Sequence, residues 1–209
     1  MAVCELISVG TEILLGDILN TDAQYLSIEL AKLGISVIHQ STVGDNRERL
    51  RAQLDEAAKR SDIIILSGGL GPTPDDLTKE VCCEFFGKEM LLHEPTVQKI
   101  KKYFSSKGIE MAQNNLKQAM LPKDCVIFPN DNGTAPGMAI EKDGVHILVL
   151  PGPPRELKPM FQNCAVPYLM QFSDRIIVSH NIRTFGIGES SMAERVNDLF
   201  DAQNPTVAP

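Results

Sequence analysis

The stretch that most constrains the fold is residues 63–80, with the sequence IIILSGGLGPTPDDLTKE. Its first four residues are apolar, a run typical of a strand that is buried on both faces. A turn with three glycines follows, and glycine lets backbone N–H groups approach an anion closely. Asp75 and Asp76 then precede the first turn of a predicted helix. A strand, a glycine turn and a helix N-terminus in this order are typical of phosphate-binding sites in α/β proteins.

A structural alternative explains the same stretch as an ordinary strand–helix turn in which Asp75 or Asp76 caps the helix. Such a cap needs one aspartate and at most one glycine, whereas this turn contains two aspartates and three glycines. We therefore favour a ligand-binding turn.

The preceding residues repeat the same alternation of strands and helices. Strands are predicted at 3–10, 36–43 and 63–66, and helices at about 21–33, 47–60 and 76–86. We expect Thr21 or Asp22 to cap the first of these helices. This order predicts a mainly parallel sheet with right-handed crossovers, and hence a three-layer αβα domain. Further along the chain we expect helices at 94–107, 113–119 and 156–170, and strands at 125–128, 137–142 and 145–150.

The last part of the chain is organised differently. It contains a strand candidate at 175–188 and a short amphipathic helix at 189–200. Because one strand and one helix cannot bury a core of their own, this last part does not form a complete domain. We assign 1–172 to the α/β domain. Residues 173–209 are assigned to a linker and the beginning of a truncated, small α+β domain. The alternative is an arm that packs on the first domain or on a neighbouring subunit.

Composition excludes several classes of partner. The chain has 20 Lys and Arg against 27 Asp and Glu, for a net charge of −7, and has no long basic block. We therefore expect no nucleic-acid partner. No apolar run approaches the ~18 residues of a membrane span, and the first ten residues do not resemble a signal peptide, so no membrane partner is expected. The five cysteines are odd in number and lack C-x-x-C spacing, which indicates reduced thiols and a cytoplasmic protein.

Polar residues follow several predicted strands, and parallel strands bring their carboxyl ends to one edge of a sheet. We expect a ligand site at this edge. Its candidate binding residues are Gly10, Thr11, Ser67, Gly68, Gly69, Leu70, Gly71, Asp75, Thr78, Gly133, Thr134, Pro151, Gly152 and Pro153. Carboxylates beside phosphates repel them unless a divalent cation lies between, which predicts a Mg²⁺-type ion. The candidate catalytic residues are Glu12, Asp45 and Asp76, with Asp45 and Asp76 as metal ligands, although Asp45 alone could be an ordinary turn residue.

Other catalytic signatures are absent from the sequence. Gly71 is followed by Pro72 where a P-loop would have Lys, and no G-x-S-x-G elbow exists. His39 and His146 fall within predicted strands, where a structural role is favoured. Lys79, in the first turn of its helix, could reach a phosphate, but we favour a solvated position.

The motifs together identify a family resemblance. SGGLGPTPDDLTKE is similar to the GGTG-x4-D-x-T-x-E motif of molybdopterin-binding domains, with Leu70 in place of the usual Thr. With TVGDN (42–46), GTAPGMA (133–139) and LPGPPRELKPMF (150–161), the chain closely resembles the CinA family of competence/damage-inducible proteins. The resemblance covers residues 3 to about 172, and FGIGESSMAERV also resembles the family's next segment.

The resemblance implies a molybdopterin-binding-like fold of the MoaB/Mog type. It also implies metal-dependent hydrolysis of ADP-ribose to AMP and ribose 5-phosphate, with Mg²⁺, Mn²⁺ or Co²⁺ as the cation and K⁺ as a further candidate. Many members carry a C-terminal domain that deamidates nicotinamide mononucleotide, an activity that we do not expect of this chain. We expect a small-molecule nucleotide substrate and a homo-oligomer, with a dimer as the first hypothesis. The alternatives are a molybdopterin- or nucleotide-binding module without hydrolytic activity, and a scaffold that binds only proteins.

Overall fold

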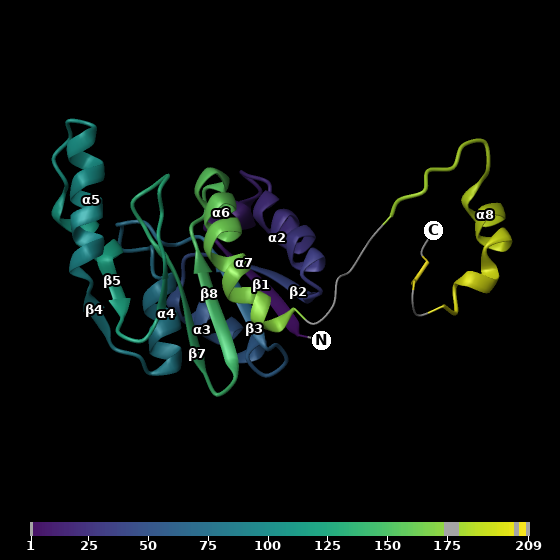
Figure 1. Cartoon of the computed structure of the whole chain (residues 1–209), viewed down its shortest axis with the longest axis horizontal. Helices are drawn as coiled ribbons and strands as arrows, with labels where there is room; N and C mark the ends of the chain where they lie inside the picture. Colours follow the sequence, from purple (N-terminus) through teal and green to yellow (C-terminus); the bar gives the residue numbers. More distant parts are fainter. Residues whose placement is uncertain (1, 174–179, 203–204, 208–209) are drawn as a thin grey trace. The chain divides into compact units, whose positions relative to one another are not determined.

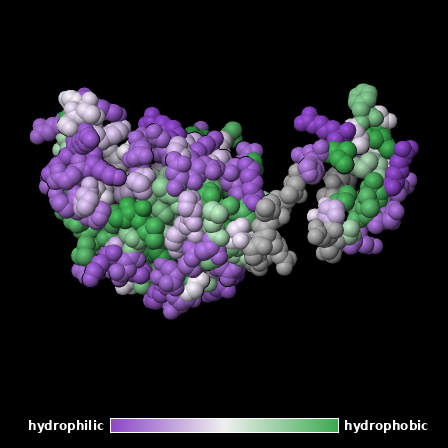
Figure 2. Space-filling model, viewed as in Figure 1, coloured by the Kyte–Doolittle hydropathy of each residue, from purple (hydrophilic) through white to green (hydrophobic). Residues whose placement is uncertain are grey.

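The computed structural model describes residues 2–173, 180–202 and 205–207 of the chain. It divides into two compact units, Met1–Ile177 and Val178–Pro209 (Figure 1). Charged and polar residues cover much of the face drawn in Figure 2, with an apolar area between them on the first unit. In the described part of the chain, no helix is long and apolar enough to cross a membrane.

The first unit is built on a six-stranded sheet with the order β2-β1-β3-β8-β7-β6. The first four strands in this order are parallel to one another, and β7 is antiparallel to both of its neighbours, β8 and β6. The strands are β1 (Val3–Val9), β2 (Ser36–Val43), β3 (Ile63–Ser67), β6 (Val126–Phe128), β7 (Gly137–Lys142) and β8 (Val145–Leu150). The predicted α/β class with a mainly parallel sheet is thus confirmed.

Helices cover both faces of this sheet, because strand residues alternate between two apolar cores. One core packs β1, β3 and β8 against α3 (Arg47–Ala57) and α4 (Thr78–Phe86). The other packs the same strands against α2 (Thr21–Lys32), α6 (Pro154–Met160) and α7 (Val166–Leu169) (Figure 1). Between α6 and α7 the chain forms a π-helix (Phe161–Ala165), so the predicted helix 156–170 is not one regular element.

A small second sheet lies outside this sandwich and was not predicted. It pairs β4 (Met90–Leu92) with β5 (Met120–Pro122) in antiparallel fashion. Between them the chain forms α5 (Glu94–Ser106) and a 3₁₀ helix (Gln113–Ala119), which share a small apolar core centred on Val97 and Ile100.

Several predicted helix starts were wrong. The cap of α2 is Asn20, whose side chain accepts a hydrogen bond from the amide of Ala23 at 3.2 Å, and not Thr21 or Asp22. The cap position of α4 is Leu77, which leaves Asp75 and Asp76 in the turn before the helix. A short helix, α1 (Thr11–Leu15), directly follows β1 and was not predicted.

In the second unit, the described residues form α8 (Glu189–Arg195) and a 3₁₀ helix (Asn197–Leu199). The strand predicted at 175–188 lies partly outside the described residues. Its described part, 180–188, contains no strand, which corrects that prediction for these positions.

Candidate functional site

A cavity of about 550 Å³ lies where the parallel strands end. The loops after β1, β2, β3 and β8 all contribute to its wall. Of the residues predicted from the sequence, the wall contains Gly10, Glu12, Asp45, Ser67, Gly68, Gly69, Leu70, Gly71, Asp75, Asp76, Thr134, Pro151, Gly152 and Pro153. A parallel sheet therefore brings together carboxylates and glycines that are far apart in the sequence.

The glycine turn after β3 is held by its neighbours on both sides. The amide of Gly68 donates to the carbonyl of Leu150 at the end of β8, at 3.1 Å. Thr78, which is buried, donates its Oγ1 proton to the carbonyl of Gly68 at 2.8 Å. Gly68 has a φ of +99°, and an added Cβ would lie 2.1 Å from the carbonyl oxygen of Val9. Only glycine fits this close approach.

The amides of Gly69, Leu70 and Gly71 have no hydrogen-bond partner among the described residues. Consecutive free amides in a glycine turn form a concavity that favours negatively charged oxygens. The turn therefore offers three donors to a phosphate group.

Asp76 is oriented by the turn itself. Its Oδ2 accepts hydrogen bonds from the amide of Thr73, at 3.0 Å, and from the hydroxyl of the same threonine. Its Oδ1 has no hydrogen-bond partner in the part of the chain that the structure describes. The carboxylate is therefore fixed at one oxygen, while the other can bind a cation.

Asp45 is held in the same manner after β2. Its Oδ2 accepts from the amide of Thr11 at 2.9 Å and from the hydroxyl of Thr11 at 2.8 Å. Among the described residues its Oδ1 also lacks a hydrogen-bond partner. Thr11 is thus a support for Asp45 and does not itself line the cavity.

Two other predicted binding residues are also absent from the cavity wall. Thr78 supports the turn from within the core, as described above. Gly133 lies beside Glu156, with whose Oε2 an added Cβ would make a contact of 2.1 Å. Gly133 lines a second cavity of about 660 Å³, and Thr134 lines both cavities.

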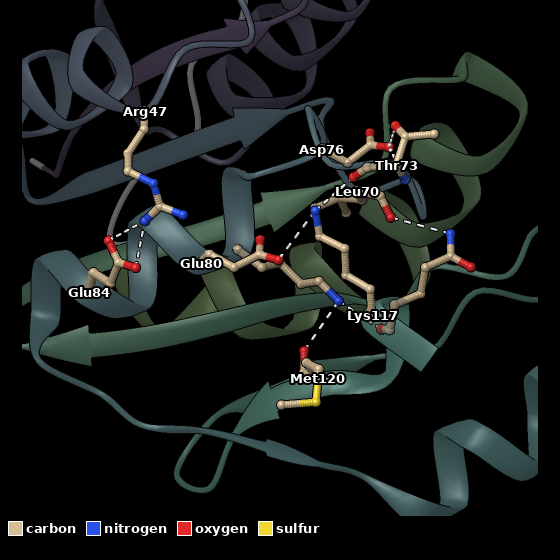
Figure 3. A network of polar contacts seen from close by, with 10 residues as sticks. Arg47, Leu70, Thr73, Asp76, Glu80, Glu84, Lys117 and Met120 are labelled. Carbon is tan, nitrogen blue, oxygen red and sulfur yellow. Dashed lines mark hydrogen bonds and ion pairs between the residues drawn. The ribbon is translucent and has the colours of Figure 1, made fainter. Parts of the chain in front are cut away.

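A polar network that the sequence did not reveal fixes the turn from the side of the small sheet (Figure 3). Lys117 donates to the carbonyl of Thr73 at 2.7 Å and lies 3.5 Å from Glu80. Gln118, which lines the cavity, donates to the carbonyl of Leu70 at 3.3 Å. The 3₁₀ helix that carries both residues therefore positions the glycine turn.

Lys79 anchors this 3₁₀ helix. It is 3 % exposed, and its Nζ donates to the carbonyls of Gln118 at 2.7 Å and Met120 at 3.3 Å. The predicted solvated position for this lysine was wrong. Burial lowers the pKa of Lys79 to about 8.

The sequence reasoning also missed cavity residues at the start of α2 and in α6. Asp22, which is nine per cent exposed, and Glu156 both lie on the wall. A signal for Asp22 existed, because it precedes Leu26 and Leu30 at intervals of four and so shares their buried helix face. Glu156 accepts a hydrogen bond from Asn130 at 2.8 Å, which ties the loop around Thr134 to α6.

The fold and this sheet-edge site define a class. The family of the "Probable molybdopterin binding domain" matches residues 5–171. A structure of the molybdopterin biosynthesis enzyme MoaB from Thermus thermophilus has a TM-score of 0.53 at 18 % identity and covers 85 % of the chain, which shows the same fold. A MoaB structure from Pyrococcus furiosus, at a TM-score of 0.54 and 18 % identity, covers 84 % of the chain. The chain is thus a molybdopterin-binding-type α/β protein of the MoaB/Mog fold.

Within this class, the chain belongs to the CinA family. The "Damage-inducible protein CinA KH domain" matches residues 179–209. A CinA-like protein of Dictyoglomus turgidum is 54 % identical over 99 % of the chain, and a protein of Clostridioides difficile named as competence-damage inducible is 54 % identical over 98 %. The crystal structure of CinA from Thermoplasma acidophilum has a TM-score of 0.73 at 31 % identity, over 79 % of this chain and 97 % of that one. The chain spans about half the length of the curated relatives, 50 % of the Dictyoglomus protein and 49 % of the Clostridioides protein.

Proposed function

We propose that the first unit is a metal-dependent pyrophosphatase that hydrolyses ADP-ribose to AMP and ribose 5-phosphate. The observation that carries the proposal is the combination, on one cavity wall, of three unpaired turn amides with the carboxylates of Asp45 and Asp76. A diphosphate offers oxygens to the amides, while the carboxylates would repel it without a cation between them. A site built only to cap a helix would need neither feature.

The donor set fits a cation that is shared with the substrate. Among the described residues, no group of three or more His, Cys, Asp or Glu is placed to hold a metal ion. Mg²⁺ is commonly bound by one or two carboxylates together with substrate phosphates and water. Asp45 and Asp76 would supply these carboxylates, and Mg²⁺, Mn²⁺ and Co²⁺ are the cations to test, with K⁺ as a further candidate. When bound, the cation would neutralise the charge that grows on the phosphates.

The residues suggest how the phosphoanhydride bond would be cleaved. Water attacks one phosphorus, the bridging P–O bond breaks, and the leaving phosphate retains the electron pair. The proton of the water passes to a carboxylate, for which Glu12 and Asp45 are the candidates on the wall. The amides of the glycine turn stabilise the charge on the non-bridging oxygens.

The test is AMP release from ADP-ribose by the full chain with Mg²⁺, Mn²⁺ or Co²⁺. We expect Asp45→Asn and Asp76→Asn each to lower kcat by ~10² or more, the usual effect of losing one strong electrostatic contact. Asp17→Asn is the matched control, because Asp17 is exposed and does not line the cavity. Absence of turnover with all three cations in the folded chain would overturn the proposal.

A second candidate function is a molybdopterin- or nucleotide-binding module without hydrolytic activity. It is favoured by the matched domain family, whose description names molybdopterin. Calorimetry with molybdopterin, ADP-ribose and AMP separates the two functions, since only the second predicts tight pterin binding without product. The homodimer and the cytoplasmic location stay predictions, to be tested by light scattering and by cell fractionation.

A further inference from the structure

Asp22 is a buried carboxylate on the cavity wall for which the proposed reaction has no use. It is the second residue of α2, and 9 % of its surface is exposed. The helix start is fixed, because the side chain of Asn20 caps α2 and also donates to Ser8 of β1 at 2.9 Å. The hydrogen bond between Asn20 and Ser8 thus attaches the start of α2, and with it Asp22, to the sheet.

The Asp22 carboxylate has a buried oxygen without a hydrogen-bond donor in the described part of the chain. Its Oδ1 is enclosed and has no hydrogen-bond partner among the described residues. Burial raises the pKa of Asp22 to about 6, and the positive charge of Lys158 on α6 offsets part of this rise. A buried acceptor without a donor is costly, so natural proteins rarely keep one unless it has a function.

The charges near Asp22 show what kind of group could bind there. α2 packs against α6 (Figure 1). This helix carries Lys158 and the cavity residue Glu156. The other titratable groups on the wall are the carboxylates of Glu12, Asp45, Asp75 and Asp76. A phosphate beside Asp22 would meet a like charge, whereas a neutral hydroxyl or amino group could donate a hydrogen bond to it.

Apolar residues that shortly precede Asp22 in the chain line the same wall. Ile18 and Leu19 line the cavity just before α2 and are 51 % and 85 % exposed. Exposed apolar surface next to an unpaired acceptor suits a flat, uncharged ring system that carries polar hydrogens. The nucleoside part of a nucleotide has both properties.

We propose that Asp22 binds the nucleoside part of the substrate by accepting a hydrogen bond from a ribose hydroxyl or from the adenine amino group. The inference rests on the proposed function, in which the diphosphate occupies the glycine turn. A rotation about χ2, which is soft in aspartate, turns either oxygen toward the cavity. The ligand then supplies the donor that the protein lacks.

The first test compares stability with affinity for ADP-ribose, using the full chain. Asp22→Ala should weaken binding at least tenfold, the loss expected for one hydrogen bond to a charged group. Asp22→Asn should weaken it less, because its side-chain carbonyl still accepts a hydrogen bond but carries no charge. The melting temperature of the free Asp22→Asn protein should be unchanged or higher, because the variant no longer buries a carboxylate. Asp17→Asn removes the same charge from an exposed position and should change neither quantity. A lower melting temperature with unchanged affinity would show a purely structural residue and overturn the inference.

The second test identifies the donor and the protonation state. If the amino group donates, the native chain binds AMP more tightly than inosine monophosphate, and Asp22→Ala binds both equally. If a hydroxyl donates, the same pattern appears between AMP and its 2′- or 3′-deoxy analogue. ADP-ribose binding should also weaken below about pH 6 in the native chain only, since its diphosphate has no monoester proton to lose near that pH.

The outcomes separate this inference from the proposed function. If the variants retain every preference of the native chain, Asp22 is not the acceptor and the pyrophosphatase proposal stands. If the native chain binds no ADP-ribose, both proposals fail.

Discussion

Replacing Gly68 by alanine tests the geometry of the glycine turn directly. Gly68 combines a φ of +99° with a contact of 2.1 Å between an added Cβ and the carbonyl oxygen of Val9. That oxygen belongs to the end of β1 and cannot rotate away as a side chain would. We therefore expect Gly68→Ala to destabilise the first unit and to displace the turn.

The magnitude follows from two separate costs. A left-handed backbone conformation costs a non-glycine residue ~1–2 kcal/mol, and forcing a methyl group into filled space costs ~1–3 kcal/mol more. Gly87 is the matched control, because its φ is +64° and an added Cβ would have no atom within 4 Å. Gly87→Ala therefore carries only the backbone cost. The difference between the two variants, ~1–3 kcal/mol, measures the steric contact together with the additional backbone strain at the larger φ of Gly68.

Urea unfolding of both variants, followed by circular dichroism, measures this difference. For a chain of this size each kcal/mol lowers Tm by ~2–4 °C, so a thermal scan should resolve the pair as well. Gly68→Ala should also weaken ADP-ribose binding, whereas Gly87→Ala should not. Equal losses of unfolding free energy in the two variants would refute the argument that β1 constrains the turn.

Three further predictions concern groups away from the cavity wall. Arg60→Ala should lower the free energy of unfolding more than Glu5→Gln does, because only the first leaves the fully buried Glu5 carboxylate without its cation. Guanidinium titrations of both variants check this order. Burial lowers the pKa of Lys79 from 10.5 to about 8, so the unfolded state binds more protons than the folded state between these two pH values. The unfolding free energy of the native chain should therefore rise with pH across this range, relative to that of Lys79→Met. Denaturant titrations of both proteins at several pH values check this. Cys4 and Cys82 are fully buried, so an aromatic disulfide reagent should modify them only when the protein unfolds. Mass spectrometry of the native protein after labelling checks this, and a label on either cysteine would contradict it.

Much of the sheet could be predicted because its strands have a clear pattern. Residues 63–66 and 145–150 are mainly apolar, as strands covered on both faces must be. The hairpin between β7 and β8 was marked by Asp143 and Gly144, both of which have positive φ. In contrast, β4 and β5 have three residues each, too few for a period to appear, and only their pairing defines them.

The candidate site also contains residues that the sequence predicts and residues that it does not. Glycines and aspartates in loops after strands gave a visible signal, because the parallel sheet determines where such loops meet. Lys79 and Gln118 gave none, since their contacts join residues 39 and 48 positions apart along the chain. A lysine in the first turn of a helix is usually exposed, and only the tertiary structure shows that carbonyl groups surround this one.

The hydrogen bond from the amide of Gly68 to the carbonyl of Leu150 has a consequence for how the site forms during synthesis. The glycine turn leaves the ribosome long before β8, so a nascent chain of that length still lacks the Leu150 carbonyl that accepts the hydrogen bond of Gly68. Parallel pairing between distant segments is also slow, because the intervening loop must close first. The proposed nucleotide binding should therefore begin only after β8 has docked beside β3, and a ligand would select fully folded chains over shorter nascent ones. Stalled nascent chains that end before and after β8, assayed for ligand protection against proteolysis, would show when binding begins.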